Sequence, residues 1–246
     1  MNENAFSAQL AIIGGTGLYQ LDRFEEIERR TLTTRWGAPS SEIVLIKNNN
    51  TSVAFITRHG FEHNIPPHKV NYRANIWALK EMGVKEIISV AAVGGISESM
   101  PPESIVIPDQ IIDYTYSRKH TYFEDELDAV QHIDFTEPYT KSLRERLLAV
   151  SGDLIDGATY AATQGPRLET AAEIQKLKRD GADIVGMTGM PEASLARELE
   201  IDYACCALVV NWAAGCAGTT KIEHPQMLKI VNKGMLRVKS VLQALI

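Results

Sequence analysis

Cysteine is scarce in this 246-residue chain, which has only Cys205, Cys206 and Cys216. Two of the three are adjacent in an apolar run and none has the spacing of a metal-ligand set, so neither a disulfide framework nor a zinc site is expected. His63 and His68 flank a short NIPP segment, but no third ligand is spaced for a metal ion. We therefore expect no metal in this protein.

Excess positive charge and long apolar runs are also missing. The formal net charge of -6 at pH 7 argues against broad binding to nucleic acid or to anionic membranes, although a local basic pocket can still hold a small anion. No apolar run has the length of a membrane span, and residues 1–15 lack the basic and apolar regions of a signal peptide. These absences predict a cytoplasmic protein with neither a nucleic-acid nor a membrane partner.

The composition that is present, 45% hydrophobic and 23% charged, is typical of a globular domain with a sizeable core. Strand-like and helix-like segments alternate, without repeats or linkers. Buried strands are expected over residues 9–15, 85–95 and 202–210, and helices over 70–83 and from about 225 onward. This alternation predicts a single α/β domain over residues 1–246, with ligands bound beyond the carboxyl ends of the strands.

Several predicted strand ends carry residues that suit a small anion. The run GGTG, residues 14–17, lets backbone N–H groups approach an anion, and Thr16 adds a hydroxyl. Neither the dinucleotide fingerprint nor the P-loop pattern is present. Arg58 and His59 follow another strand, where arginine can grip phosphate in a fixed fork. Thr188 would lie near a helix N-terminus. Each motif alone also fits a tight turn, a surface pair or a helix cap.

Other strand ends suit a planar, polar ligand. In CCALVVNWAAG, residues 205–215, apolar residues lead into a single amide, Asn211, which must be paired by the protein or by a ligand. In TQGPRLET, residues 163–170, Leu168 could face a ring and Glu169 could accept a ring N–H. Met187 offers an adaptable apolar surface, although core packing would explain it equally well.

Together these segments resemble the purine nucleoside phosphorylase and methylthioadenosine phosphorylase family over nearly the whole chain. The segments that carry the resemblance are AIIGGTG, RHG, VNYRANIWALKEMG, AAVGG, TQGPRLET, GMTGMPEASLARE and the strand with Asn211. The resemblance implies a twisted mixed sheet that forms a distorted barrel flanked by helices, and a homotrimer. It also implies cleavage of a purine nucleoside by inorganic phosphate to the free base and a pentose 1-phosphate, with phosphate as co-substrate and no cofactor.

The resemblance also implies roles for individual residues. It assigns the phosphate site to Thr16, Arg58, His59, Ala91, Ala92 and Thr188. It places Met187 against the ribose, Glu169 and Asn211 at the base, and Asn211, Arg58 and His59 in catalysis. Leu168 takes the place of an aromatic residue that packs on the purine in relatives, so stacking there is expected to be weaker.

Two positions bear on the choice of base. Adenine-type members of the family carry aspartate at the position of Asn211, and a second aspartate two residues on is replaced here by Ala213. An amide can donate to O6 of a 6-oxopurine and accept a proton shared at N7. An ionised Glu169 accepts the N1–H of a 6-oxopurine but repels the N1 lone pair of adenine. Because a mismatch leaves buried polar groups unpaired, both residues favour hypoxanthine or guanine.

The 5′ group leaves alternatives open. Besides Glu169, the specificity pocket is expected to include Ile222, Glu223, His224, Met227 and His63, the last from a neighbouring subunit. An apolar pocket from Ile222 or Met227 would favour S-methyl-5′-thioinosine, our first hypothesis, whereas His224 could bind the 5′-hydroxyl of inosine or guanosine. Methylthioadenosine is a weaker alternative. A non-catalytic nucleoside-binding protein and a hydrolase that uses water are different classes, against which the predicted phosphate site argues.

Overall fold

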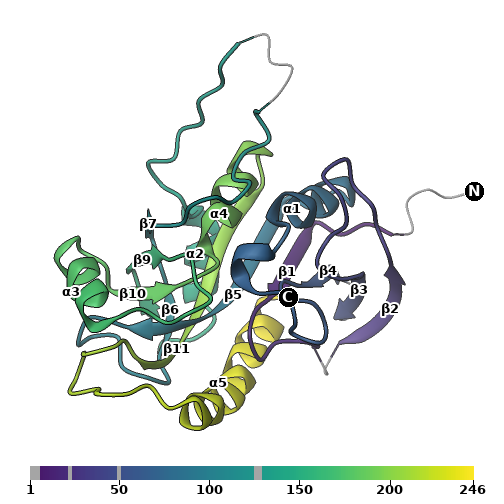
Figure 1. Cartoon of the computed structure of the whole chain (residues 1–246). Coiled ribbons are helices and arrows are strands. Elements are labelled where there is room, and N and C mark those ends of the chain that lie inside the picture. The colour runs from purple at the N-terminus through teal and green to yellow at the C-terminus, as the bar shows by residue number, and fades with distance from the viewer. Residues whose placement is uncertain (1–5, 22–23, 49–50, 125–128) are drawn as a thin grey trace, which may run out of the picture.

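A computed structural model describes residues 6–21, 24–48, 51–124 and 129–246 of the chain (Figure 1). In this part of the chain, eleven strands form one mixed sheet: β1 (Leu10–Gly14), β2 (Glu25–Arg30), β3 (Ile43–Asn48), β4 (Thr51–Thr57), β5 (Glu86–Gly95), β6 (Ile105–Ile107), β7 (Gln110–Asp113), β8 (Ile155–Asp156), β9 (Thr159–Ala162), β10 (Ile184–Gly186) and β11 (Asp202–Trp212). The helices are α1 (Tyr72–Glu81), α2 (Lys141–Leu148), α3 (Ala171–Arg179), α4 (Gly189–Glu198) and α5 (His224–Leu245), with a short 3₁₀ helix at Pro67–Lys69.

The sheet closes on itself around the long strand β5. β11 pairs in parallel along one edge of β5, while the other edge pairs first with β1 and then, antiparallel, with β10. From β11 the pairing continues to β6 and β8, and from β10 to β9 and β7. Since only two residues separate β6 from β7, and β8 from β9, these pairings complete a ring. The predicted distorted barrel is therefore confirmed, with β1, β4, β3 and β2 extending from it as a wing.

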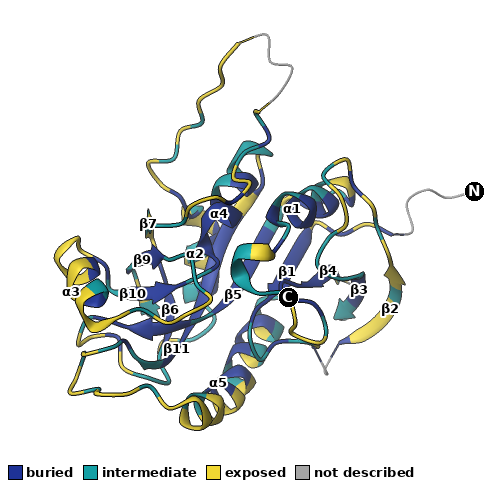
Figure 2. Cartoon of the chain, viewed as in Figure 1, coloured by how far each residue is buried: buried dark blue, intermediate teal, exposed yellow. Residues whose placement is uncertain are grey.

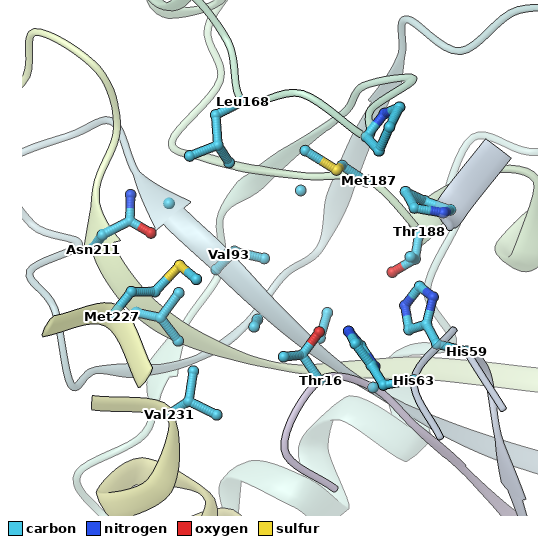
Figure 3. A pocket seen from close by; sticks show the side chains of 18 of the residues that line it. Thr16, His59, His63, Val93, Leu168, Met187, Thr188, Asn211, Met227 and Val231 are labelled. Atoms are coloured by element: carbon cyan, nitrogen blue, oxygen red, sulfur yellow. The ribbon is translucent and has the colours of Figure 1, made fainter. Parts of the chain in front are cut away.

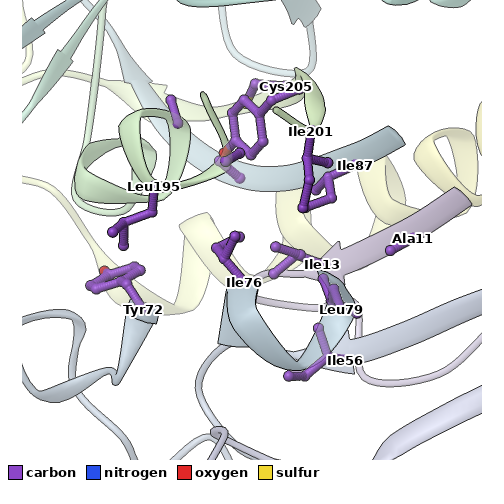
Figure 4. Packing of buried hydrophobic residues seen from close by; sticks show 14 of the residues in the cluster. Ala11, Ile13, Ile56, Tyr72, Ile76, Leu79, Ile87, Leu195, Ile201 and Cys205 are labelled. Atoms are coloured by element: carbon purple, nitrogen blue, oxygen red, sulfur yellow. The ribbon is translucent and has the colours of Figure 1, made fainter. Parts of the chain in front are cut away.

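Apolar side chains on both faces explain the central strands. β5 and β11 are buried along nearly their whole length, as expected for parallel strands covered by helices on both sides. Successive residues of β1 point to opposite faces: Ile13 packs with Ile76 and Leu79 of α1 (Figure 4), whereas Ile12 belongs to the cluster under α5. Figure 2 shows the resulting pattern, a buried sheet with exposed outer faces on the helices α3 and α5.

Two features of the fold differ from the pattern that the sequence predicts. β2 has the sequence EEIERR, is largely exposed and shows no apolar alternation, yet it pairs antiparallel with β3. β11 runs two residues past the predicted end, and its register against β5 shifts between Val209 and Asn211. Such irregularities re-aim side chains, so Asn211 leaves the regular ladder where the cavity begins. No helix within the described ranges combines the length and apolar character needed to cross a membrane.

Candidate active site

One cavity of about 730 Å³ collects residues from the carboxyl ends of several strands (Figure 3). The predicted site residues that line it are Thr16, Arg58, His59, His63, Ala91, Ala92, Leu168, Glu169, Met187, Thr188, Asn211, Ala213, Ile222, His224 and Met227. His63 lines the cavity of its own chain, next to His59, whereas the sequence reasoning expected it to come from a neighbouring subunit. Glu223 does not line it; this residue precedes the first turn of α5. Among the described residues, no group of three or more His, Cys, Asp or Glu side chains could hold a metal ion.

The polar groups of the cavity gather at one end. Figure 3 shows Thr16, His63, His59 and Thr188 close together, on loops that follow β1, β4 and β10. Gly15 lies beside them, and a Cβ there would be 2.3 Å from the Val90 carbonyl oxygen and 3.0 Å from Nη1 of Arg58. A glycine is therefore needed for the first loop to approach β5 and Arg58 this closely. This end has the hydroxyl and N–H groups of an anion site.

The guanidinium group of Arg58 bonds mainly to groups in the protein interior. Its Nε and Nη2 donate to Oε2 and Oε1 of Glu192 at 2.7 and 2.8 Å, and both side chains are fully buried. Nη2 also donates to Ser89 Oγ at 2.7 Å, and Nη1 to the Val90 carbonyl at 2.9 Å. Four of the five N–H groups of the guanidinium are thus occupied. The two N–H groups that were expected to bind phosphate as a pair bind Glu192 instead, because a buried cation needs a counterion. One N–H on Nη1 remains for a ligand.

Glu192 is the functional residue that the sequence reasoning missed. Burial works to lower the Arg58 pKa, but the adjacent Glu192 carboxylate outweighs it and raises this pKa above its usual value. Glu192 also accepts a hydrogen bond from the Tyr203 hydroxyl at 2.8 Å. The sequence does contain a signal for Glu192, since it is an acidic residue within the run GMPEASLA of small and apolar residues. The signal is weak because a carboxylate at the start of a helix is usually explained by the helix dipole.

His59 is held as a neutral imidazole. Its Nδ1 lies 2.8 Å from the Ile65 carbonyl oxygen, so Nδ1 carries the hydrogen and Nε2 is the acceptor. Burial, followed by the positive charge of Arg58, lowers the His59 pKa to about 4. At neutral pH the ring therefore offers an acceptor at Nε2. The His63 ring stands 4.9 Å from the His59 ring and 5.6 Å from that of Tyr19, and burial lowers the His63 pKa as well.

The other end of the cavity holds the two predicted base-reading residues. Asn211 Nδ2 donates to the Trp212 carbonyl at 2.8 Å, which leaves its second N–H and Oδ1 for a ligand. Glu169 Oε1 accepts from the Thr163 hydroxyl at 2.6 Å. The Leu168 side chain lines the cavity although the residue is 46% exposed. The amide of Asn211 thus has one partner in the protein and is free to take others.

Helix α5 forms an apolar wall beside the polar end. Met227, Leu228 and Val231 line the cavity together with Ile222, while His224 lies at the first turn of the helix. The wall packs directly on the loop that carries Thr16: Gly17 has φ +84°, and a Cβ there would be 2.4 Å from Cγ1 of Val231. One face of the helix thereby fixes both the apolar wall and the loop.

Arg118 forms hydrogen bonds to two of the loops that line the cavity, one after β9 and one after β10. The side chain is buried, and Nη1 donates to the carbonyls of Met187 and Met190 at 2.8 and 2.6 Å. Nη2 donates to the carbonyls of Thr163 and Gln164 at 3.2 and 2.8 Å. No sequence motif marks this residue, which lies on the long segment between β7 and α2 (Figure 1).

Comparison with known proteins agrees with this geometry. The model of the Phosphorylase superfamily matches residues 9–246. The chain is 52% identical over 236 residues, covering 94% of this chain and 96% of the relative, to a probable S-methyl-5′-thioinosine phosphorylase of Pseudomonas syringae pv. tomato. It is 44% identical over 234 residues, 92% of this chain and 87% of the relative, to a 6-oxopurine nucleoside phosphorylase of Pyrococcus furiosus.

Solved structures agree as well. A methylthioadenosine phosphorylase from Schistosoma mansoni in complex with adenine has a TM-score of 0.91 at 29% identity, covering 97% of this chain and 91% of that one. A methylthioadenosine phosphorylase from an antarctic soil metagenomic library has a TM-score of 0.89 at 38% identity, covering 98% of this chain and 85% of that one. Sequence and structure thus lead to one conclusion: the chain belongs to the Phosphorylase superfamily.

Proposed function

We propose that this protein is a pentosyltransferase that cleaves the N-glycosidic bond of 6-oxopurine nucleosides with inorganic phosphate, in purine salvage. Its main substrate is S-methyl-5′-thioinosine, and the products are hypoxanthine and 5-methylthioribose 1-phosphate. The observation that carries this proposal is one cavity with an anion end around Thr16, His59 and Thr188 and a base end around Asn211 and Leu168 (Figure 3), which Glu169 also lines. The relatives described as S-methyl-5′-thioinosine and 6-oxopurine nucleoside phosphorylases support it.

Phosphate binds at the polar end. The hydroxyls of Thr16 and Thr188, the backbone at Ala91 and Ala92 and the remaining N–H of Arg58 surround it, and Nε2 of His59 accepts from its P–OH group. Because the Arg58 charge is already balanced by Glu192, the phosphate keeps its negative charge toward the sugar. That charge stabilises the ribosyl oxocarbenium transition state, and a phosphate oxygen then attacks C1′. Met187 packs against the ribose.

The purine leaves at the other end. As the bond from C1′ to N9 breaks, its electron pair moves into the purine ring and density builds on N7 and O6. The free N–H of Asn211 donates to O6. A water molecule supplies the proton that N7 takes up as the base departs, and Oδ1 accepts a hydrogen bond from the N7–H that results. Glu169 accepts N1–H through Oε2, since Oε1 is bonded to Thr163. The bond that Asn211 donates to O6 strengthens as negative charge develops there, which makes it catalytic, whereas the bond from N1–H to Glu169 recognises the base.

The apolar wall favours the methylthio group. Met227, Leu228 and Val231 offer hydrocarbon and sulfur surface, where a buried hydroxyl would lack a partner. One observation favours a second candidate, inosine or guanosine: His224 also lines the cavity and can bond a 5′-hydroxyl. Methylthioadenosine fits the apolar wall but not the base end.

We also propose that the chain is one nucleoside phosphorylase domain over residues 1–246 that acts as a homotrimer in the cytoplasm. The family match over residues 9–246 supports the domain assignment. The trimer rests on the family resemblance, whereas the compartment is the one expected from the features of the sequence.

A substrate panel tests the proposed function. The purified protein is incubated with methylthioinosine, inosine, guanosine, adenosine and methylthioadenosine, with and without phosphate, and the free base is measured. We expect phosphate-dependent release of hypoxanthine, fastest from methylthioinosine. Base release without phosphate would indicate a hydrolase, tight binding without release would indicate a binding protein, and preferential release of adenine would overturn the base assignment.

A further inference from the structure

We propose that Thr163 is a positioning residue that sets base preference by holding Glu169 toward the purine. This inference rests on the proposed function. The Thr163 hydroxyl donates to Oε1 of Glu169 at 2.6 Å, a short bond of the kind formed with a carboxylate. The bond engages one carboxylate oxygen and leaves Oε2 for the substrate.

The backbone of Thr163 is fixed on both sides. Its N–H donates to the Gly186 carbonyl at 2.8 Å, and its carbonyl accepts from Arg118 at 3.2 Å. The residue directly follows β9, and the same Gly186 carbonyl lies 3.3 Å from the Thr163 hydroxyl as a weaker second acceptor. The hydroxyl therefore has a defined position from which to orient a longer and more flexible side chain.

Glu169 needs such a tether because it borders three cavities, and only one of them holds most of the predicted site residues. Besides the main cavity, it lines a side cavity of about 200 Å³, whose wall includes Thr163 itself together with Tyr114 and Arg167. Two cations, Arg167 and Lys176, line this side cavity, and Arg167 forms a bidentate pair with Glu173 at 2.8 and 2.7 Å. Glu173, and more weakly Glu169, raise the Arg167 pKa, so Glu169 lies within the electrostatic reach of this cation. Without the Thr163 hydroxyl, the carboxylate can turn toward Arg167 and away from the main cavity.

The orientation of Glu169 decides which purine is accepted. Held toward the main cavity, the carboxylate accepts the N1–H of a 6-oxopurine and repels the N1 lone pair of adenine. Turned away, it does neither. Loss of the Thr163 hydroxyl therefore weakens the binding of 6-oxopurines and reduces the repulsion of adenine. The ratio of kcat/KM for the two substrates then changes more than either kcat/KM value alone.

Two substitutions of nearly equal size test this role. Thr163→Val keeps the shape and removes the hydroxyl, whereas Thr163→Ser keeps the hydroxyl. The readouts are kcat/KM for methylthioinosine and methylthioadenosine at saturating phosphate and the Kd values of hypoxanthine and adenine. We expect Thr163→Val to lower the 6-oxopurine over 6-aminopurine ratio about tenfold, and Thr163→Ser to stay within about twofold of the parent. In a Glu169→Gln background, Thr163→Val should leave the ratio unchanged.

Each outcome decides between a positioning role and a structural one. Three outcomes would overturn the inference. They are an equal loss of kcat/KM for both substrates in Thr163→Val, an equal loss in the valine and serine variants, and a further change of the substrate ratio in the Glu169→Gln background. The parent protein separates this from the function itself: if it releases no hypoxanthine with phosphate, the proposed function fails. The Kd ratio still tests the Thr163 role in that case. A cooperative unfolding transition in each variant verifies that it is folded.

Discussion

Asn211 shows how one side chain can be stable without a ligand and still be ready for one. Its bond to the Trp212 carbonyl orients the amide and leaves one N–H and Oδ1 toward the cavity. Under the proposed function, Asn211 acts with Glu169 and Thr163 to select a 6-oxopurine. At the residue scale, specificity thus depends on which donors and acceptors the protein leaves unused.

The substitution Asn211→Asp tests this reading. A carboxylate cannot donate to O6 or to the Trp212 carbonyl, but it can accept from the 6-amino group of adenine or, when protonated, donate to N7. We expect kcat/KM for methylthioinosine to fall by roughly ten- to a hundredfold and the relative activity on methylthioadenosine to rise. Steady-state kinetics on both substrates measure the change. Asn211→Ala serves as control, since it removes the amide without adding an acceptor. An unchanged base preference would count against the role of Asn211.

His59 makes stability depend on pH in a defined direction. Its pKa in the folded protein is about 4, against about 6.5 in an unfolded chain, so the unfolded state binds more protons between these values. Stability is therefore unaffected by His59 above pH 6.5 and falls as the pH drops toward 4. The shift corresponds to about 3 kcal/mol at its full extent.

Urea unfolding of the parent and of His59→Gln between pH 7 and pH 4 measures this effect. We expect the parent to lose up to about 3 kcal/mol more than the variant over this range. The comparison isolates His59 because His63 and the carboxylates are present in both proteins. Parallel curves would show that His59 is not held neutral by its surroundings.

At the scale of the elements, the site is assembled from loops that belong to different strands. Arg118 connects the segment after β9 with the segment after β10, and α5 presses Val231 onto the loop after β1. Neither contact is between neighbours in sequence. The loops keep their geometry because other parts of the chain donate hydrogen bonds to their backbone carbonyls and pack closely against their glycines.

Arg118→Met tests the bridge between the two loops. The substitution keeps much of the side-chain volume and leaves the carbonyls of Gln164, Met187 and Met190 without their donor. We expect the free energy of unfolding to fall by about 3 kcal/mol, and the KM values for both phosphate and nucleoside to rise, because both loops loosen. Urea denaturation and steady-state kinetics measure the two effects. Arg118→Lys, which retains the charge and some donors, should lose less; equal losses in both variants would contradict the bridging role.

At the scale of the whole molecule, the proposed homotrimer is directly measurable. Sedimentation equilibrium or light scattering should give three times the mass of one chain, with no dependence on dilution over the range used for assays. Closed cyclic symmetry makes a trimer end at three copies without forming larger assemblies. A mass of one or two chains would contradict the proposal, and the single-chain cavity would then have to account for activity by itself.

Much of the fold follows from local patterns in the sequence. The apolar runs of β1, β5 and β11 can be stable only as buried strands, and the helical spacing around Ile76 and Leu79 predicts α1. The carboxyl ends of these strands pointed to Thr16, Ala91, Ala92 and Asn211, which line the cavity. These signals are local because they depend on periodicity and on which side chains avoid water.

The tertiary structure decided how the polar residues are paired. β2 is a strand because β3 offers it hydrogen-bonding partners, although its sequence is charged. Arg58 donates its fork to Glu192, 134 positions away, and the Thr163 hydroxyl holds Glu169 because the turn after β9 brings the two together. The sequence by itself determined which segments are buried, since burial is a property of each residue in water. Only the closed sheet determined which buried donor meets which acceptor, since a hydrogen bond requires two groups within about 3 Å.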